Sequence, residues 1–306
     1  MASTSVTNTQ PQKVGFATFC ANPAVRQNIA GVVGEKNTQS FIASIVSAVQ
    51  ANKSLAECTN SSIFSAALLG ESLKLSPSPQ LGQFFLVPYK NKNGVTEAQF
   101  QLGSKGYRQL AIRSGQYRKI VASAVKKGEL KSFNPITEEY VFEPILDMEL
   151  RESLPVVGYY AAFELINGFK KEIYWSKEKM LAHADRYSSA FSLNAKGGKY
   201  PKVSYQDYLD GKYPAKDEWL YSSFWYKDFD GMAEKTMLRQ LISKWGVMSI
   251  DLQRAFTSDM GVLNESGEVK YVDNLPEDPA ETAETEIAEK ANAEELVIEA
   301  DAEEIS

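Results

Sequence analysis

The sequence predicts an α+β fold, with a small antiparallel β-sheet core that includes a β-hairpin and is flanked by helices. Apolar residues recur with the helical period of 3.6 in several segments, whereas others are rich in β-branched and aromatic residues and are separated by Asn-Gly pairs. The two kinds of segment do not alternate regularly, which argues against a doubly wound parallel sheet. With 43% hydrophobic residues, the chain can bury a core of its own.

The first part of the chain combines a polar start with two helical segments. Residues 1–13 are polar, and we expect them to be disordered. A helix is predicted over 38–51, and a second begins at Asn60 or Ser61, which suit the N-cap, and ends before Pro77. The apolar face of the first helix is formed by Phe41, Ile42, Ile45, Val46 and Val49.

The middle of the chain predicts strands around one short helix. Segments 82–89 and 97–103 form a hairpin with Asn93-Gly94 at its tip. The helix that follows ends at Gly115, which suits the position just after a helix. Further strands are predicted at 117–128, 138–144, 155–166 and 170–175, the last two joined across Asn167-Gly168.

The last part of the chain returns to helices. Ser176 is predicted to open a helix that runs to about Phe191, and a final helix runs from about Tyr226 to Trp245. Between them, residues 193–221 are rich in Gly, Lys and Tyr with little periodicity, so we expect a loop-rich insertion. The chain thus divides into a disordered N-terminus (1–13), one folded domain (14–265) and a flexible C-terminal tail (266–306).

The net charge of −6 averages two different regions. Residues 273–306 hold 13 acids and one lysine, a net of −12, which leaves 26 acids and 32 bases, a net of +6, for residues 1–272. Residues 89–131 alone hold ten bases and two acids. A clustered basic surface is typical of proteins that bind polyanions, and terminal blocks of like charge usually form solvated interaction tails.

Cysteine content and hydropathy favour a cytoplasmic protein without a membrane partner. Cys20 and Cys58 lie far apart and form no CxxC pattern, which suits a reducing compartment. The first fifteen residues lack the apolar centre of a signal peptide, and no apolar run reaches 18 residues.

Two clusters of cations are candidates for binding phosphates. Lys105 and Arg108 share an edge of the short helix, and Lys235 and Arg239 share a face of the last one. If hairpin, helix and strand are neighbours, as sequential elements usually are, their cations converge on one groove. Arg113 could instead bind carbonyl groups at a helix end, and any such cluster could be merely a solvated face. The hairpin contributes Lys90 and Lys92, and the following strand contributes Arg118, Lys119, Lys126 and Lys127.

Residues 187–229 interleave six lysines with aromatic residues, among them Tyr187, Phe191, Tyr200, Tyr205, Tyr208, Tyr213, Trp219, Tyr221 and Trp225. Exposed rings in a basic setting suit unpaired bases, which stack on them with about 1–3 kcal/mol per base. Core packing is the alternative for each ring taken singly.

Signals of catalysis are weak. The single histidine, His183, cannot assemble a triad or a zinc site, and we interpret it as an ordinary surface or packing residue. The chain has no GxxxxGK[ST] loop for phosphates of ATP. Glu138, Glu139 and Asp228 could in principle hold a metal ion, but acids in such patterns more often lie on solvated faces or at helix starts.

Three stretches resemble, in order, the RecT family of phage and prophage single-strand annealing recombinases. They are "SLKLSPSPQLGQFFLVPYKNK", "LGSKGYRQLAIRSGQYRKIVASAVKKGE" and "WYKDFDGMAEKTMLRQLISKWGVMSIDLQRAF", and the resemblance covers roughly residues 40–260. The chain departs from the family at Lys74, at Glu234, where a second lysine is common, and in the long insertion. Matched onto this sequence, the family motifs fall on Gly106, Tyr107, Arg108 and Arg113, and on Lys235, Thr236 and Arg239.

The resemblance implies an ATP-independent protein, not an enzyme, that coats single-stranded DNA and pairs complementary strands through an annealed duplex intermediate. It also implies a sheet core whose protomers assemble into rings or helical filaments, and work beside a phage exonuclease and the host single-strand binding protein in a bacterial cytoplasm. No cofactor is expected to be required, although Mg²⁺ could modulate DNA binding. The fourteen residues named above as phosphate-binding or motif residues are the predicted DNA-binding set.

Other functions remain open on the sequence alone. One is a metal-dependent nuclease that uses Glu138, Glu139 or Asp228, and another is a generic nucleic-acid-binding or capsid-associated structural protein. The acidic tail could mimic phosphate or dock partners.

Overall fold

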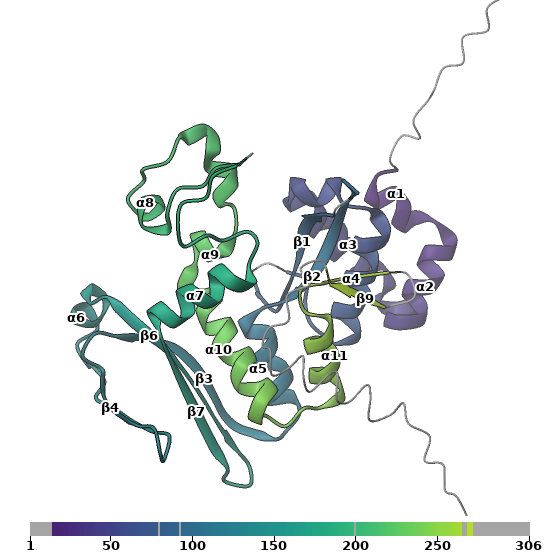
Figure 1. Ribbon diagram of the computed structural model, residues 1–306. Coiled ribbons are helices and arrows are strands. Elements are labelled where there is room, and N and C mark those ends of the chain that lie inside the picture. The colour runs from purple at the N-terminus through teal and green to yellow at the C-terminus, as the bar shows by residue number, and fades with distance from the viewer. Residues whose placement is uncertain (1–13, 79, 92, 199, 265–267, 272–306) are drawn as a thin grey trace, which may run out of the picture. The chain divides into compact units, whose positions relative to one another are not determined.

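Two antiparallel sheets form the framework of the protein, and helices pack on one face of each (Figure 1). The computed structural model describes residues 14–271 except positions 79, 92, 199 and 265–267. The described helices are α1 (Phe16–Ala21), α2 (Pro23–Val33), α3 (Glu35–Ala51), the 3₁₀ helix η1 (Lys53–Glu57), α4 (Asn60–Ser72), α5 (Ser104–Arg113), α6 (Met148–Ser153), α7 (Lys177–Tyr187), α8 (Tyr205–Leu209), the 3₁₀ helix η2 (Ala215–Tyr221), α9 (Phe224–Lys227), α10 (Phe229–Trp245) and α11 (Ile250–Ser258). The described strands are β1 (Phe84–Lys90), β2 (Thr96–Leu102), β3 (Tyr117–Lys126), β4 (Leu130–Asn134), β5 (Glu139–Phe142), β6 (Val156–Leu165), β7 (Lys170–Ser176), β8 (Gly261–Leu263) and β9 (Val269–Tyr271).

The predicted N-terminal helices are present, with shifted starts. α3 buries Phe41, Ile45 and Val49 on the predicted face. α4 is capped by Thr59, whose hydroxyl accepts a hydrogen bond from the amide of Ser62, and not by Asn60 or Ser61. α1 and α2 are additional helices, and the predicted disorder of residues 1–13 lies outside the described part of the chain.

The first sheet has four strands in the order β1-β2-β8-β9. The predicted hairpin forms one side of this sheet, and in it β1 pairs with β2 from Phe84 opposite Leu102 to Lys90 opposite Thr96. Gly94, at φ 78°, takes the left-handed conformation that the tip requires. β8 and β9 are three residues each and carry no periodic signal, and β9 extends the fold to Tyr271, past the predicted boundary at 265.

The second sheet has three strands in the order β3-β6-β7, as the predicted segments suggest. Alternation gives it a buried face, which α10 and α7 cover, and an outer face. Small residues on the buried face, Ala122 opposite Ala161, leave space for α10 to pack closely. α10 in turn buries Ala233, Met237, Leu238, Leu241 and Ile242 completely. Each large apolar side chain buried in this way contributes about 1.5–3 kcal/mol.

A second hairpin, β4-β5, lies against the outer face. The rings of Phe142 and Tyr160 are 4.8 Å apart, and the Tyr140 amide donates to Glu172 at 3.4 Å. Only β5 of this hairpin is predicted, because β4 is an exposed strand with no buried face to impose an apolar pattern.

The last part of the chain differs from the prediction in its helices and their ends. The insertion at 193–221 contains α8 and η2, and the final helix is broken at Asp228 into α9 and α10. Asp228 accepts a hydrogen bond from the amide of Gly231, so it caps α10 where a continuous helix was expected. α7 ends at Tyr187, four residues early, and α11 was not predicted.

Candidate nucleic-acid interface

The two motif helices, α5 and α10, meet at a buried carboxylate, that of Asp259. This residue directly follows α11 and is fully buried. Its oxygens accept hydrogen bonds from the Leu102 amide and the Tyr107 hydroxyl, each at 2.7 Å. They also pair with Lys235 Nζ at 3.4 Å and with an Arg239 guanidinium nitrogen at 3.0 Å.

The surroundings keep Asp259 ionised. Burial raises the pKa of its carboxyl, but Lys235, Arg239 and the hydrogen bonds from Tyr107 and Leu102 outweigh burial and lower it. The Tyr107 phenol has its pKa raised well above 10.0 by burial and by the charge of Asp259, so it stays a donor. One anion thus faces two cations, and the cluster keeps a net positive charge toward Arg239, whose side chain is 19% exposed.

The structure brings the motif residues together inside the protein. Tyr107, Lys235 and Thr236 are buried, and the Thr236 hydroxyl donates to the Met232 carbonyl at 2.9 Å. Gly106 is buried where α5 approaches the backbone of Gln83, and any Cβ there would overlap the Gln83 carbonyl oxygen. Contact of these residues with DNA stays a prediction, since their polar groups bind other parts of the protein in this conformation.

Four predicted cations are held by neighbouring protein groups. Arg108 donates to the Ala122 carbonyl at 3.2 Å and pairs with Glu234 at 3.6 Å. The other three bind carbonyl or carboxylate groups. Arg113 donates to Leu73 O at 2.6 Å, Arg118 pairs with Glu164 at 2.7 Å, and Lys126 donates to Leu154 O at 2.9 Å.

Arg113 does bind a carbonyl group at a helix end, as the alternative interpretation expected, but the helix is α4 and not its own helix α5. Leu73 is the C-cap of α4, not of α5. Arg113 also pairs with Asp251 at 3.0 Å, so one side chain links α4, α5 and α11.

Four other predicted cations are exposed, and they form two pairs whose members lie far apart. Lys90 lies at the tip end of the β1-β2 hairpin and Lys105 beyond its opposite end, roughly 20 Å away along seven strand residues. Lys119 and Lys127 lie near opposite ends of β3, about 25 Å apart. Each of these two pairs is therefore spread along a hairpin or a strand, and the convergence of the four on one groove stays a prediction. Lys92 lies outside the described residues.

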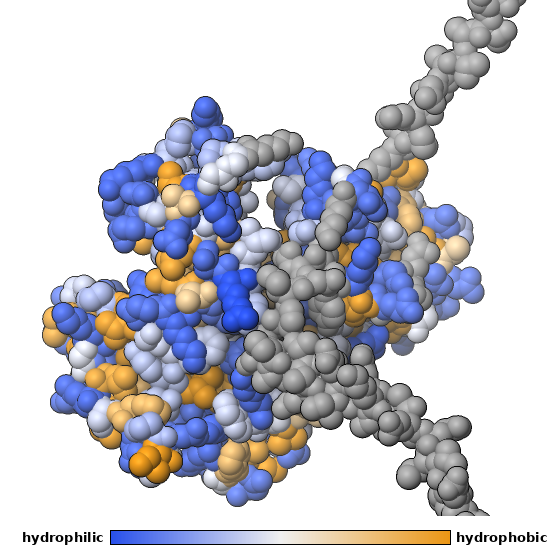
Figure 2. Space-filling view, viewed as in Figure 1, coloured by the Kyte–Doolittle hydropathy of each residue, from blue (hydrophilic) through white to orange (hydrophobic). Residues whose placement is uncertain are grey.

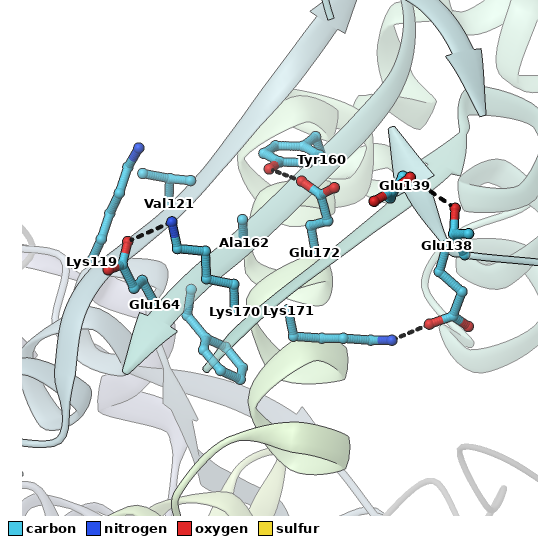
Figure 3. A pocket seen from close by; sticks show the side chains of 12 residues that line it. Lys119, Val121, Glu138, Glu139, Tyr160, Ala162, Glu164, Lys170, Lys171 and Glu172 are labelled. Carbon is cyan, nitrogen blue, oxygen red and sulfur yellow. Dashed lines mark hydrogen bonds and ion pairs between the residues drawn. The ribbon is translucent and has the colours of Figure 1, made fainter. Parts of the chain in front are cut away.

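Lys119 borders a pocket of about 490 Å³ between the β4-β5 hairpin and the outer face of the three-stranded sheet (Figure 3). The other lining charges are mostly paired: Lys170 with Glu164 at 3.4 Å and Lys171 with Glu138. Figure 3 shows Lys119 extending away from these pairs. The pocket lining holds acids as well as cations, which makes it a poor receptor for a polyanion.

The sequence prediction missed a group of cations on α7 and α10 whose charges all act on His183. It consists of Lys179 and Arg186 on α7 and Arg239 on α10, arranged around His183, and is called the α7 cluster below. Figure 2 shows strongly hydrophilic side chains gathered over α7. Lys179 lies over the Trp175 ring at 4.4 Å and Arg186 over the Tyr187 ring at 5.2 Å, so cations and aromatic faces are interleaved.

His183 reports the electrostatic field of this cluster. Its pKa is lowered from 6.5 to about 4 by burial and then by the positive charges of Arg239, Lys179 and Arg186. Its ring packs between Trp175 at 5.3 Å and Tyr187 at 4.6 Å, which agrees with its interpretation as a packing residue.

The local sequence explains how α7 presents these groups. Ser176 caps the helix by accepting a hydrogen bond from the Lys179 amide at 3.2 Å. Lys179, His183 and Arg186 are spaced four and three residues apart, so they share one helix face. This spacing was the available signal, but a cation–histidine–cation row on a single helix is too common to stand out.

Most aromatic residues of 187–229 pack into the core. Phe191, Tyr205 and Tyr226 are buried, with the Phe191 ring 5.1 and 5.0 Å from the other two. Tyr200 and Trp219 are 55% and 58% exposed, and their rings meet edge to face at 5.4 Å. Core packing thus accounts for most of these rings, and this pair remains available to a ligand.

The acids considered for a metal site have other contacts. Glu138 pairs with Lys171, Glu139 accepts from the Thr137 hydroxyl at 3.0 Å, and Asp228 caps α10. Within the described residues, no group of three or more His, Cys, Asp or Glu side chains is arranged to hold a metal ion. Cys20 and Cys58 are both buried and are not joined in a disulfide. None of the described helices is long and apolar enough to cross a membrane.

Comparison with known proteins agrees with the sequence motifs. The model of the RecT family matches residues 39–271. The chain is 34% identical to the uncharacterized protein YqaK of Bacillus subtilis, over 89% of this chain and 84% of YqaK. It is 27% identical to Protein RecT of Escherichia coli, over 79% of this chain and 78% of that protein. With its motifs, its mixed antiparallel fold and a family match over most of its length, the chain belongs to the RecT family.

Proposed function

We propose that this protein binds single-stranded DNA and pairs complementary strands in homologous recombination, without ATP and without hydrolytic chemistry. Membership of the RecT family supports a role in recombination and annealing in general. The observation that carries the finer proposal is the α7 cluster, in which three cations from two helices converge beside aromatic rings.

Phosphate contacts suit this chemistry. Annealing requires a strand to be held by its backbone while its base edges stay free to find a partner. Lys179 and Arg186 are exposed on α7, and Arg239 is held beside them by Asp259. Contacts of this kind release counterions and are independent of base sequence. The exposed pair Tyr200 and Trp219 offers a stacking surface for unpaired bases.

Assembly and partners complete the proposal. The fold of residues 14–271 serves as the DNA-binding and oligomerisation domain, and copies assemble into rings or helical filaments along DNA. A phage exonuclease and the host single-strand binding protein are the proposed partners, in a bacterial cytoplasm. No cofactor is required, and Mg²⁺ acts at most on the DNA affinity.

Binding of a labelled single-stranded oligonucleotide, followed by fluorescence anisotropy across a salt series, tests the site. Arg186→Ala and Lys179→Ala should each weaken binding several-fold at low salt. Each should reduce the slope of log affinity against log salt by about 0.7 for every phosphate that the variant no longer neutralises. Lys53→Ala, an exposed lysine of η1, is the matched control and should leave both quantities unchanged.

An annealing assay separates the function from its alternatives. Two complementary oligonucleotides mixed with the protein, without ATP, should form duplex faster than they do alone, and faster than a non-complementary pair associates. Loss of labelled strand only when Mg²⁺ is present would favour a nuclease. Tight binding without faster pairing would favour a generic nucleic-acid-binding protein. Wild-type slopes for both α7 variants would remove the α7 cluster from the interface.

A further inference from the structure

Three exposed apolar side chains gather at the start of β6. Leu146, Met148 and Leu150 are 85%, 58% and 51% exposed, in and just before α6. Asp147, Glu149 and Glu152 lie among them. Three cations lie nearby: Arg151 pairs with the buried Glu129 at 2.6 Å, Lys126 donates to Leu154 O, and Lys127 is exposed, with its backbone amide bonded to Pro155 O at 3.0 Å. Asp147, Glu149, Glu152 and Glu129 still outnumber these three cations by one. We call Leu146–Glu152 the acidic end patch.

A second exposed apolar patch lies beyond the other end of β6. Ile166, Val247 and Ile250 are 55%, 39% and 84% exposed. Backbone and side-chain contacts tie their segments together, because Ile166 N donates to Gln116 O and Tyr117 donates to Val247 O, each at 3.0 Å. The patch is completed by Ile112, Phe169 and Trp245, which are 59%, 46% and 39% exposed.

Cations prevail around this second patch. The flanking segments contribute Arg113, Arg118, Lys170, Lys244 and Arg254 against Glu164 and Asp251. We call it the basic end patch. β6 spans ten residues between the two patches, so they are separated by about 30 Å. Figure 1 shows α6 at one end of the three-stranded sheet and the C-terminal end of α10 toward the other.

We propose that the acidic end patch of one copy docks on the basic end patch of a second copy, in a head-to-tail contact. Contiguous exposed apolar surface marks interaction sites. Because the two patches carry opposite charge, contact of an acidic patch with a basic one is favoured over contact between two like patches. A contact between two different surfaces repeats indefinitely, which yields a ring if the rotation closes and a filament if it does not. This inference rests on the proposed assembly and names the surfaces that form it.

Two variants, each blocked at one patch, test the contact by analytical ultracentrifugation without DNA, from 1 to 100 µM in order of magnitude. Leu146→Asp with Leu150→Asp blocks the acidic end patch, and Ile166→Lys with Ile250→Lys blocks the basic end patch. The wild type should form species larger than a dimer, and each variant alone should be a monomer. An equal mixture should form a dimer of one of each and nothing larger, because only one pair of intact patches remains. Val32→Asp, a 51% exposed residue of α2 outside both patches, should assemble like the wild type.

Several outcomes would overturn the proposal. They are a wild type that stays monomeric throughout, variants that assemble normally, and a mixture that stays monomeric. Assembly by only one of the two variants would show a contact of one patch with itself. Far-UV circular dichroism and the urea midpoint establish that the variants fold. Neither patch shares a residue with the α7 cluster, so each patch variant should bind a short single-stranded oligonucleotide within about twofold of the wild-type affinity. If a protein that assembles normally did not bind the oligonucleotide, the proposed function would be contradicted and the contact between copies would not.

Discussion

Asp259 organises the residues that define the family motifs. Its carboxylate receives donors from β2, α5 and α10, and no residue of the sequence prediction pointed to it, because a single acid after a helix carries no pattern of its own. The motif was recognisable from the sequence, whereas its role was not. A sequence does not distinguish a buried lysine from an exposed one when its partner is distant in the chain. Here the partner of Lys235 is Asp259, which lies more than twenty residues further along.

Replacing Asp259 by Asn should destabilise the protein strongly. The amide keeps the shape but leaves Lys235 and Arg239 partly buried without an anion, and breaking a buried pair in this way costs about 3–5 kcal/mol. Urea unfolding measures the loss. Tyr107→Phe, which removes one hydrogen bond to the same charged carboxylate, is the comparison and should cost about 1.5–3 kcal/mol. Equal losses in the two variants would mean that the charge of Asp259 contributes little.

His183 should make the stability of the protein fall as the solution is acidified. Its folded pKa of about 4 lies below the ordinary 6.5, so between these values the unfolded chain takes up a proton that the folded protein does not. The contribution is complete above pH 6.5 and is lost on acidification toward pH 4, by up to about 3 kcal/mol. His183→Gln, which cannot be protonated, should show a smaller loss of unfolding free energy between pH 7 and pH 4.5. Parallel curves for variant and wild type would mean that protonation of His183 does not cause the loss.

At the scale of elements, the sequence predicted the helices and strands whose apolar residues recur with a regular period. The β1-β2 hairpin, α5 with its terminal Gly115, and the β6-β7 pair follow from alternation and turn residues close in sequence. β8 and β9 were missed because strands of three residues are formed by pairing with distant partners, as when β8 joins β2 through Phe100 opposite Gly261. The same limit applied to the site, since the α7 cluster depends on a packing of α7 near α10 that no local pattern encodes.

Gly106 is conformationally ordinary but sterically essential to the packing of α5. A side chain there would overlap the carbonyl oxygen of Gln83, which is backbone and cannot rotate away. Gly106→Ala should therefore lower the free energy of unfolding by about 1–3 kcal/mol despite the better helix propensity of alanine. Gly31→Ala in α2 is the matched control, since nothing lies within 4 Å of its Cβ position, and it should stabilise by up to about 1 kcal/mol.

If Gly106→Ala were as stable as Gly31→Ala, α5 would not be held against the loop before β1. A variant that stays stable but loses DNA affinity would instead support the place of Gly106 in the predicted DNA-binding set. Chemical denaturation and anisotropy on the same samples distinguish these outcomes.

At the scale of the whole molecule, charge is divided along the chain. Residues 1–272 carry a net of +6, and residues 273–306 carry −12, so the whole chain is acidic although its first 272 residues are basic. A tethered polyanion competes with any free polyanion for the same cations at a high effective concentration. The distribution of charge was readable from the sequence, but the α7 cluster was not, because its cations come from two helices that are far apart in the chain.

Ending the chain after Val272 should therefore tighten binding of single-stranded DNA. The gain should be largest at low ionic strength and should shrink toward 1 M salt, where the screening length falls to about 3 Å. A full-length variant whose tail acids are changed to Asn and Gln separates charge from bulk, because it keeps the length and should bind as tightly as the truncated protein. Anisotropy titrations at two or more salt concentrations measure the effect. If truncation leaves the affinity unchanged, the tail does not compete for the phosphate site, and docking of partner proteins becomes its remaining proposed role. If truncation tightens binding but neutralisation does not, the tail obstructs DNA by its volume, which would make its 13 acids irrelevant to the competition.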